Sequence, residues 1–472
     1  MKQFKYEQLA NTIKTQIDGG MLQEGDKVPS IRQLATIYCL SKVSVQKALH
    51  TLEARDILFV KHKSGYYVSK KQTDQHLFID STAFSKPKLI DIPEVFYEIM
   101  ESGAAFDIAP NRLDNSAVSN SLLLLNRHLS RAVRSNVQYN ALYYSEPQGD
   151  KALRLQICKH YRKRGMNVSE NDICITSGCQ NSLFLALTAT CKAGDIVAIE
   201  SPAFYGVLQL LQQLKLKAIE LPCSFTNGLS VDTLREAANN YDIKACILTA
   251  NFSTPTGAII PISEKQKIVA LAGEKKFTII EDDIYGDLGF HSNSKPLKSF
   301  DTKDTVIHCS SFSKSLSRDL RIGWLISRKY TKKVAQLKLI HQLSTSKSMQ
   351  NGLTTYMMDG SFERHLYQHR KTLLTQRNQL TNSIKNHWEV STKFTIPDGG
   401  LSIWIELSIK INTIELYNNA ISEGIIITPG GLFTSTERFS NCFRLSFAHP
   451  TTGHRLKAII RLGEICKEMI RK

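Results

Sequence analysis

Apolar residues at the start of the chain recur with the spacing of short helices. The first helix has one apolar face, made of Tyr6, Leu9, Ala10, Ile13 and Ile17. Gly19-Gly20 predicts its end. Ser30 predicts the N-cap of a second helix. After a short turn at Cys39–Ser41, a third helix should bury the apolar positions between Val45 and Leu52 and turn its polar side outward. We therefore expect three short helices, with a tight turn between the last two.

A β-hairpin is predicted after the third helix. The apolar runs Ile57–Val60 and Tyr66–Val68 flank a basic tip, Lys61-His-Lys-Ser-Gly65. Helices, turn and hairpin in this order describe a winged helix-turn-helix, whose third helix would enter the major groove of DNA. The alternative is a small helical bundle with solvated charges. The agreement of helix spacing, turn and hairpin favours the DNA-binding interpretation.

From about residue 105 the pattern changes to apolar strands that alternate with helices. Residues 71–104 are polar at first and are then interrupted by Pro87 and Pro93, which predicts a linker with a short helix near Val95–Met100. The strand-like runs are Asp172–Thr176, Ile196–Glu200, Ala245–Thr249, Phe277–Glu281, Thr305–Cys309 and Ile322–Ile326. Such alternation predicts an α/β fold with a mainly parallel sheet and functional loops beyond the strand ends.

A smaller α+β lobe is expected over about residues 350–472. A long helix at about 361–387 precedes three strands and a closing helix; the strands are Leu401–Leu407, Ile425–Thr428 and Cys442–Phe447. The predicted organisation is a DNA-binding domain at 1–70, a linker at 71–104 and an α/β domain at 105–472.

Composition and charge narrow the class of protein. The chain is 42% hydrophobic and 22% charged, as in soluble globular proteins. It has no apolar run of bilayer length, no signal-peptide core and ten scattered cysteines without a Cys-x-x-Cys pair. These features favour a cytoplasmic protein without a metal site or a membrane span. The net charge of +17 attracts polyanions, and residues 1–70 hold eleven Lys or Arg against six Asp or Glu.

The stretch Ser310–Gly323 places Lys314 among small hydroxyl residues directly after an apolar strand. A lysine in such a loop is by itself typical of a solvated surface charge. Three other loops change that interpretation. Thr176–Gln180 is a strand-to-helix turn that can present backbone N–H groups to an anion. Phe204-Tyr205 follows a second strand, and Ile279–Tyr285 ends a third in three acids that need a partner.

Together these loops supply what pyridoxal 5′-phosphate requires. Lys314 offers an amine for a Schiff base, and Arg321 offers a guanidinium for a phosphate. An aspartate at a strand end can keep the pyridine nitrogen protonated, so that the ring acts as an electron sink. An aromatic side chain can stack on the ring.

Residues 4–68 resemble the GntR-type winged-helix family. The matching runs are Gly25–Ala35, Ser41–Val45, Ala48-Leu49, Leu52-Glu53 and Ser64–Val68. The resemblance implies binding to a double-stranded DNA operator through Arg32, Ser41, Lys42, Ser44, Gln46 and Lys47, with Lys61, Lys63 and Gly65 in the wing. Two positions depart from the family. Lys42 stands where arginine is common, which replaces a bidentate contact by a point charge, and Asp56 stands where glycine is common.

Residues 105–470 resemble the fold-type I, class I aminotransferases. The matching motifs are Tyr144–Gly149, Leu153-Arg154, Ser177-Gly178, Pro255–Gly257, Asp282-x-x-Tyr285, Ser311–Lys314 with Arg321, Gly399-Gly400, Pro429-Gly430 and Phe443–Phe447. Thr254 departs from the family, in which asparagine usually bonds the ring hydroxyl at this place. Trp324 and Trp404 are expected in the core.

This resemblance implies a role for each matching position. Lys314 would form the Schiff base with pyridoxal 5′-phosphate, Asp282 would bond the ring nitrogen, and Tyr285 would bond the ring hydroxyl. Phe204, in preference to Tyr205, would stack on the ring. The phosphate would be held by Ser177, Gly178, Cys179, Ser311 and Arg321, with Tyr144 reaching the phosphate of a neighbouring subunit and Arg444 holding a substrate or effector carboxylate.

A GntR-like DNA-binding domain joined to an aminotransferase-like domain resembles the MocR-type regulators. The resemblance implies a homodimeric transcription factor that binds pyridoxal phosphate and senses an amine or amino acid, which would shift the arrangement of the domains on DNA. One alternative is a catalytically active aminotransferase with a DNA-binding appendage. Another is a DNA-binding protein whose body serves only to dimerise.

Overall fold

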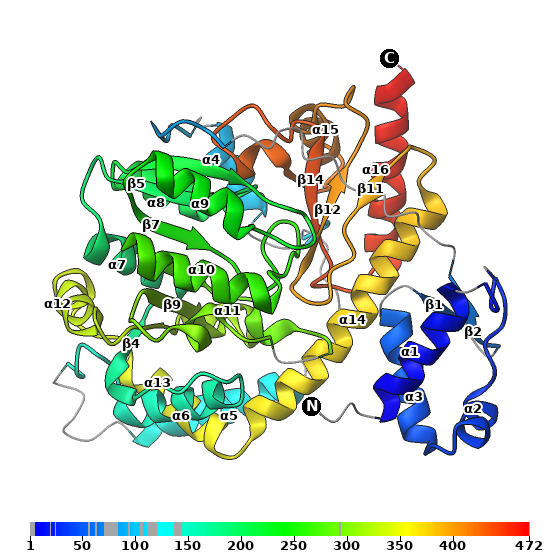
Figure 1. Cartoon of the computed structure of the whole chain (residues 1–472), viewed down its shortest axis with the longest axis horizontal. Helices are drawn as coiled ribbons and strands as arrows, with labels where there is room; N and C mark the ends of the chain where they lie inside the picture. The colour runs from blue at the N-terminus through cyan, green and yellow to red at the C-terminus, as the bar shows by residue number, and fades with distance from the viewer. Residues whose placement is uncertain are drawn as a thin grey trace. The chain divides into compact units, whose positions relative to one another are not determined.

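The structure is a computed structural model that describes residues 5–18, 20–23, 25–54, 57–61, 64–69, 84–92, 95–103, 107–110, 120–135, 144–291 and 294–471. Two units follow one another along the chain, Met1–His76 and Leu77–Lys472 (Figure 1). Among the described helices, none is long and apolar enough to cross a membrane.

The N-terminal unit has three helices and a hairpin, as predicted. Its elements are α1 (Lys5–Asp18), α2 (Ile31–Ile37), α3 (Lys42–Ala54), β1 (Leu58–Lys61) and β2 (Gly65–Val68). Ser30 caps α2: its hydroxyl accepts a hydrogen bond from Gln33 N at 3.3 Å, and Gln33 Oε1 accepts one from Ser30 N at 2.8 Å. The apolar face of α3, from Val45 to Leu52, is buried against α1 and α2. The two strands pair antiparallel and form the predicted wing.

The larger unit is built on an eight-stranded sheet in the order β3-β6-β5-β7-β8-β9-β10-β4. The strands are β3 (Lys88–Leu89), β4 (Ile173–Thr176), β5 (Ile196–Ser201), β6 (Lys217–Pro222), β7 (Ile243–Leu248), β8 (Thr278–Asp282), β9 (Val306–Ser311) and β10 (Gly323–Ile326). The central pairs, from β6 to β9, are parallel. The outer pairs are antiparallel, because β3 runs against β6 and β10 runs against both β9 and β4. The prediction of a mainly parallel sheet is confirmed.

Helices cover both faces of this sheet, because successive strand residues face opposite sides. On β5, Val197 and Ile199 join one core and Ala198 joins the other. The first core packs under α7 (Cys179–Thr190), α8 (Tyr205–Gln213) and α12 (Thr331–Gln342), and the second under α9 (Val231–Asn240) and α10 (Ile262–Lys275). A third core lies among α5 (Asn120–Ser135), α6 (Lys151–Arg162) and α13 (Lys347–Met358), and it buries Trp324 as predicted.

The C-terminal lobe begins with a long helix, α14 (Ser361–His387) (Figure 1). Its sheet has the order β11 (Lys393–Phe394), β12 (Ser402–Glu406), β14 (Cys442–Ser446) and β13 (Thr428–Pro429), and it packs with α15 (Thr413–Ile421) and α16 (Gly453–Arg471). Trp404 is buried in this lobe, as predicted. The strand predicted at Ile425–Thr428 is shorter and later. Ile426 N donates to Ile108 O at 2.8 Å, so this segment bonds to the chain after α4 (Val95–Gly103) before it reaches β14.

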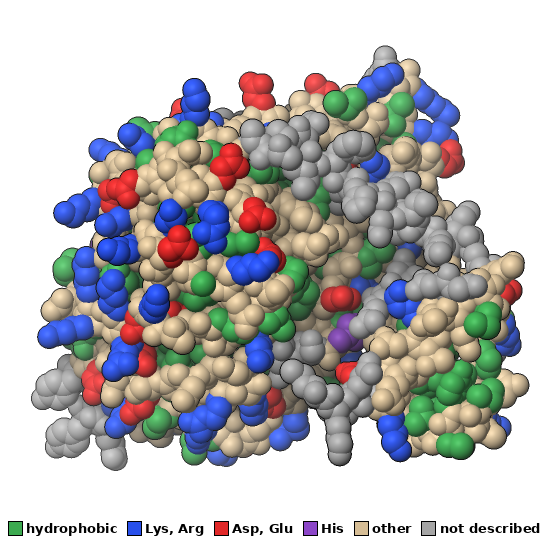
Figure 2. All heavy atoms as spheres, viewed as in Figure 1, with side chains coloured by type: hydrophobic (Ala, Val, Ile, Leu, Met, Phe, Trp, Pro, Cys, Tyr) green, Lys and Arg blue, Asp and Glu red, His purple; other side chains and the backbone are tan. Residues whose placement is uncertain are grey.

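The positive charge of the larger unit is dispersed on the face that Figure 2 presents. Lys and Arg side chains are interspersed there with Asp and Glu, and no single basic patch dominates the face. The high net charge of the chain therefore does not by itself identify a nucleic-acid surface on this unit.

Candidate functional site

Lys314 lies in a single helical turn at the end of a buried strand. The turn, α11 (Phe312–Ser315), directly follows β9, and Ser311 caps it by accepting a bond from Ser313 N at 3.3 Å. Burial holds the pKa of the Lys314 amine well below its usual range, and the nearby guanidiniums of Arg318 and Arg444 lower it further. An amine with a lowered pKa is unprotonated more often at neutral pH and is a better nucleophile.

Helix α14 holds this turn from the opposite side. The ring of His365 bonds to the Ser315 carbonyl oxygen at 2.9 Å, and His369 stacks on His365 with 5.4 Å between ring centroids. Burial lowers the pKa of both rings, so they remain neutral at physiological pH. The turn that carries Lys314 is thus held by neutral histidine rings, which add no positive charge beside the lysine.

Asp282 ends the neighbouring strand β8, where it pairs in register with Cys309 of β9. Burial raises the pKa of its carboxyl to about 6. Two donors reach the same oxygen, Oδ1: the Cys179 thiol and the Ile284 backbone N–H, each at 3.2 Å. Both of these bonds go to Oδ1, and neither goes to Oδ2. Cys179, which we expected at a phosphate, thus also touches the predicted partner of the ring nitrogen.

The start of α7 forms a cradle of backbone N–H groups beside Arg321. Gly178 has a φ of 103°, and a Cβ at this position would lie 3.0 Å from Arg321 Nη2. Arg321 Nη2 donates to Ser177 O at 2.8 Å. Gln342 of α12 donates to the Ser177 hydroxyl. The first N–H groups of a helix lack intrahelical acceptors, and a guanidinium beside them makes an anion site.

Two aromatic rings follow β5 and differ in exposure. Phe204 caps α8 and is half-buried, whereas Tyr205 is buried; their ring centroids are 4.7 Å apart. The Phe204 ring covers Gly206 so closely that a Cβ there would lie 2.5 Å from it. Tyr205 packs instead against Phe433, at 5.8 Å between centroids. Phe204 therefore keeps more of its ring accessible than Tyr205, which is buried against Phe433.

Tyr285 and Arg444 complete the cluster around Lys314. Burial raises the pKa of the Tyr285 phenol above its usual range, while Arg444 and the Thr254 hydroxyl oppose the rise. Arg444, on β14, is 2% exposed; it donates to Thr428 Oγ1 at 3.1 Å, and its guanidinium lies over the Tyr205 and Phe433 rings at 6.0 and 5.5 Å. The C-terminal lobe thus brings an arginine to the strand ends of the large sheet.

Sequence reasoning missed two members of this cluster. Arg318 lies close enough to Lys314, Tyr285 and Arg444 for their charges to affect one another. The sequence indicated its place in the cluster only through its spacing of four residues from Lys314. Gln342 carried no signal, because its contact with Ser177 depends on how α12 packs on the sheet. Tyr144, by contrast, is 76% exposed and does not join the cluster within one chain.

A buried charge network supports the strand that carries Asp282. Arg164 Nη1 lies 2.6 Å from Asp283 Oδ2 and 3.4 Å from Asp287 Oδ1. His160 bridges Asp287 at 2.9 Å and Glu363 of α14 at 3.4 Å. The network therefore links α6, the loop after β8 and α14.

The network should make stability depend on pH. Burial opposes the charged ring of His160, but Asp287 and Glu363 raise its pKa to about 9. A raised pKa stabilises the fold below the unfolded value of about 6.5, and this contribution is lost as pH rises through the folded value. We expect the difference in free energy of unfolding between wild type and His160→Gln to shrink by up to about 3 kcal/mol between pH 6 and pH 9.5. Urea denaturation at each pH measures it, and a constant difference would contradict the assignment.

Some of the side chains predicted to contact DNA are exposed, and others already form contacts within the domain. Arg32 on α2 and Lys42 and Gln46 on α3 are exposed. The hydroxyls of Ser41 and Ser44 instead bond to each other at 2.9 Å, and Ser41 Oγ caps α3 by accepting from Ser44 N at 3.1 Å.

The Lys47 amine lies 4.0 Å from the centre of the Tyr6 ring, so it forms a cation–π contact within the domain. In the wing, Lys61 ends β1, and Gly65 begins β2 with a φ of 118°. Lys63 and Asp56 lie outside the described residues.

Two family models match the two units of the chain. The model for bacterial regulatory proteins of the gntR family matches residues 5–68, and the model for aminotransferase class I and II matches residues 118–462. Among solved structures, the chain superposes on the kynurenine aminotransferase of Pyrococcus horikoshii with a TM-score of 0.72 and 25% identity, over 81% of this chain and 96% of that one.

Relatives of this chain match it over nearly its whole length and theirs. YjiR of Escherichia coli K12, described as an uncharacterized HTH-type transcriptional regulator, is 32% identical over 462 residues, 98% of each chain. The HTH-type transcriptional regulator NorG of Staphylococcus aureus USA300 is 26% identical over 94% of this chain and all of its own. The chain therefore belongs to the GntR family, and it is an HTH-type transcriptional regulator of the MocR type, with a DNA-binding domain fused to a class I and II aminotransferase domain.

Proposed function

We propose that this regulator binds pyridoxal 5′-phosphate at the strand ends around Lys314, and that an amine or amino acid at this site alters DNA binding. The observation that carries the proposal is the meeting of three features: Lys314 with its lowered pKa, the buried carboxyl of Asp282 whose Oδ1 accepts from Cys179, and the α7 cradle beside Arg321. When bound, the cofactor supplies an electrophilic aldehyde carbon and an electron-withdrawing ring.

The residues present fit this cofactor. Gly178 and Arg321 leave a cradle that a side chain at residue 178 would fill, as a phosphate requires. Asp282 suits a protonated ring nitrogen, Phe204 offers a ring face, and the amine of Lys314 suits an aldehyde. Tyr285 and Thr254, whose side chains interact with each other, would be the hydroxyl groups that meet the ring hydroxyl.

Arg444 is the residue that would hold an effector carboxylate. Because it belongs to the C-terminal lobe while Lys314 belongs to the large sheet, a ligand that contacts both would favour one arrangement of the two lobes. That preference is the physical origin we propose for regulation. The coupling can be no larger than the difference in affinity of the ligand for the two arrangements.

We further propose that the protein acts as a homodimer with paired operator half-sites. Tyr144, exposed in one chain, would then reach the phosphate held by its neighbour. Large exposed apolar side chains on α5, α12 and α13, among them Leu123, Ile340 and Met358, are consistent with a covered surface. Two linked DNA-binding domains bind DNA more tightly than one.

The test uses purified protein, pyridoxal 5′-phosphate and DNA selected by the protein from a random-sequence pool. We expect an absorbance band from lysine-bound cofactor and a DNA affinity that changes when the cofactor and a panel of amino acids are added. Footprints and affinities that are identical with and without saturating ligands would overturn the regulatory proposal.

A catalytically active aminotransferase is the second candidate. The low pKa of Lys314 favours it, because an unprotonated lysine can also move a proton at the substrate carbon. Rapid conversion of a common amino acid in a single-turnover assay would support this function. Slow or absent conversion with tight ligand binding would support a sensor.

The DNA-binding proposal makes a prediction for Lys42. This side chain is exposed on α3, where it would meet phosphate or a base edge as a point charge. We expect Lys42→Ala to weaken DNA binding about 3- to 10-fold and to reduce the slope of log affinity against log salt by about 1. Lys14→Ala on α1 is the control. Fluorescence anisotropy at several salt concentrations measures both, and an unchanged salt slope would remove Lys42 from the interface.

A further inference from the structure

Glu220 is a buried carboxylate that gathers donors from distant parts of the chain. It lies on β6 with 1% of its surface exposed. Its Oε2 accepts from Ser201 Oγ at 2.9 Å and from Thr434 Oγ1 at 2.6 Å. Its Oε1 accepts from both the backbone N–H and the hydroxyl of Ser435 at 2.6 Å. Four neutral donors around one carboxylate hold its geometry tightly.

These donors lie at the base of two loops of the cofactor site. Ser201 ends β5, three residues before Phe204. Ala203 N donates to Phe433 O at 2.7 Å, and Phe433 packs against Tyr205 and Arg444. Glu220 therefore holds two segments at once: the loop that carries Phe204, and the C-terminal segment whose Phe433 packs against Arg444.

The same residue is tied to the segment through which the chain enters the larger unit. Ser85 N donates to Glu220 O at 3.2 Å, and Glu220 N donates to Ser85 Oγ at 2.8 Å. Three residues further on, β3 begins and pairs with β6, and the Lys88 amine donates to Ser435 O. The entry segment thus contacts β6 and the C-terminal lobe at one point.

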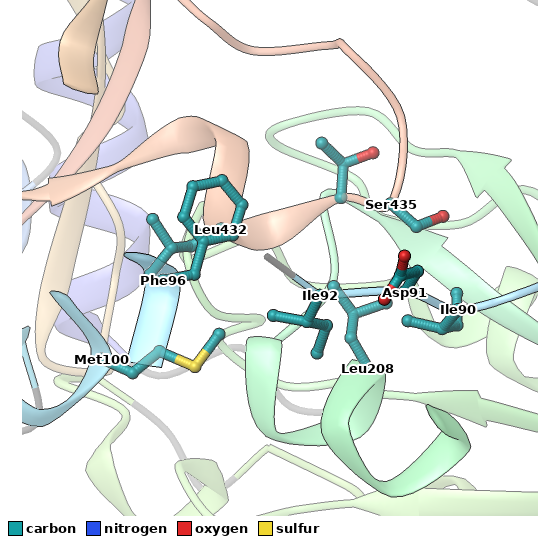
Figure 3. A pocket seen from close by; sticks show the side chains of 9 residues that line it. Ile90, Asp91, Ile92, Phe96, Met100, Leu208, Leu432 and Ser435 are labelled. Atoms are coloured by element: carbon teal, nitrogen blue, oxygen red, sulfur yellow. The ribbon is translucent and has the colours of Figure 1, made fainter. Parts of the chain in front are cut away.

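Apolar contacts extend this attachment beyond β3. Figure 3 shows Ile90 and Ile92 on the side of Leu208, and Phe96 close to Leu432. Leu208 belongs to α8, which begins directly after Phe204, and Leu432 directly precedes Phe433. The cavity between these side chains is about 10 Å³, room for one water and no ligand. The contact is therefore closely packed, and a movement of either loop would displace residues 84–92 and Phe96.

We propose that Glu220 is a positioning residue that sets the Phe204 loop and the Phe433–Ser435 segment around the cofactor, and that it transmits their state to the entry segment, Ser85–Ile92. This inference rests on the proposed cofactor function, because it assigns a structural route to regulation by that site. Residues 84–92 follow the DNA-binding unit in the sequence, so a change in their attachment changes how the segment that joins the two units is anchored on the larger unit.

The decisive variant is Glu220→Gln, which keeps the shape of the side chain but replaces one acceptor oxygen by an amide donor. We expect its dissociation constant for pyridoxal 5′-phosphate to rise about tenfold, equal to about 1.4 kcal/mol. Its affinity for the selected DNA without cofactor should equal that of wild type. The change of DNA affinity on adding saturating cofactor should be lost. Glu264→Gln is the control, because Glu264 also accepts a backbone bond, from Val231 N at 3.0 Å, but lies outside the site.

Two smaller changes separate the two parts of the proposal. Ser435→Ala removes one bond on the lobe side and should weaken cofactor binding about threefold, equal to about 0.7 kcal/mol. Ser85→Ala removes a bond on the entry side; it should leave cofactor affinity unchanged and reduce the response of DNA binding to cofactor. Both keep the buried carboxylate, so they remain informative if Glu220→Gln fails to fold.

The outcomes distinguish this inference from the function on which it rests. If wild type binds no pyridoxal 5′-phosphate, the proposed function fails. If wild type binds and responds but Glu220→Gln binds and responds equally, Glu220 has no positioning role. If Ser85→Ala responds as wild type does, the entry segment is not the route of transmission.

Discussion

Replacing Lys314 by alanine should remove the absorbance band of lysine-bound cofactor and raise the dissociation constant for pyridoxal 5′-phosphate by about 100-fold, equal to about 2.7 kcal/mol. The reason is that burial and the charges of Arg318 and Arg444 lower the pKa of the amine, which favours its unprotonated form, the form that attacks an aldehyde. Arginine at this position keeps a cation but offers no such nucleophile. An absorbance titration with Lys314→Ala, Lys314→Arg and wild type measures the effect.

The control is Lys332→Ala, which removes an exposed lysine of α12 and should behave as wild type does. A retained band in Lys314→Ala would mean that another lysine attaches the cofactor. The same variant separates the functional alternatives. If the cofactor regulates DNA binding, Lys314→Ala loses the response of DNA affinity to added cofactor. If the body serves only to dimerise, wild type shows no response and the substitution changes nothing in DNA binding.

Replacing Arg164 by methionine should lower the free energy of unfolding by about 3–5 kcal/mol. Arg164 is 2% exposed and contacts both Asp283 and Asp287, so its removal leaves the buried Asp283 without this counter-charge, while Asp287 keeps His160 at 2.9 Å. Denaturation in urea, followed by near-ultraviolet circular dichroism, measures the loss. The exposed pair of Arg235 and Glu274, 3.4 Å apart, is the comparison, and Arg235→Met should cost less than about 1 kcal/mol.

A double variant, Arg164→Met with Asp283→Asn, tests the cause of this loss. Removing the negative charge of Asp283 should recover part of the stability, because the amide needs no counter-charge and can still accept the bond from Asn251 Nδ2, which is 2.8 Å in the native chain. A double variant less stable than Arg164→Met would show that packing, and not charge, dominates. Because Asp283 adjoins Asp282, Arg164→Met should also weaken cofactor binding.

The strand ends of this protein could be located from sequence because each is an apolar run that stops at a polar residue. That rule places Asp282 and Lys314 on adjacent loops, and the structure pairs their strands in parallel register. It also places the turn at Ser177–Cys179. Helix α14 was predicted with the bounds that the structure shows, since its periodic pattern is long and its ends are marked.

Contacts that depend on three-dimensional packing could not be found in this way. The bond of Cys179 to Asp282 joins residues 103 positions apart and depends on the rotation of α7 over the sheet. Glu220 is a lone acid in a strand-like run, and its donors come from β5 and from the segment after Phe433. The segment at Ile425–Thr428 has a strand-like composition, but Ile426 bonds to Ile108 instead. The amino-acid composition of such a segment does not indicate which hydrogen-bond partner it takes.

The antiparallel return of β10 along β9 has a consequence for the order in which the site assembles. Ser311 pairs with Gly323, so Lys314, Arg318 and Arg321 all lie on one loop closed by neighbouring strands. Closing so short a loop costs little entropy, whereas bringing Asp282 and Cys179 together requires a contact far apart in sequence. The cationic half of the site can therefore form as a local hairpin. Asp282 and Cys179 join it only when the sheet has assembled, so the low pKa of the Lys314 amine, which depends on burial, arises only in the complete sheet.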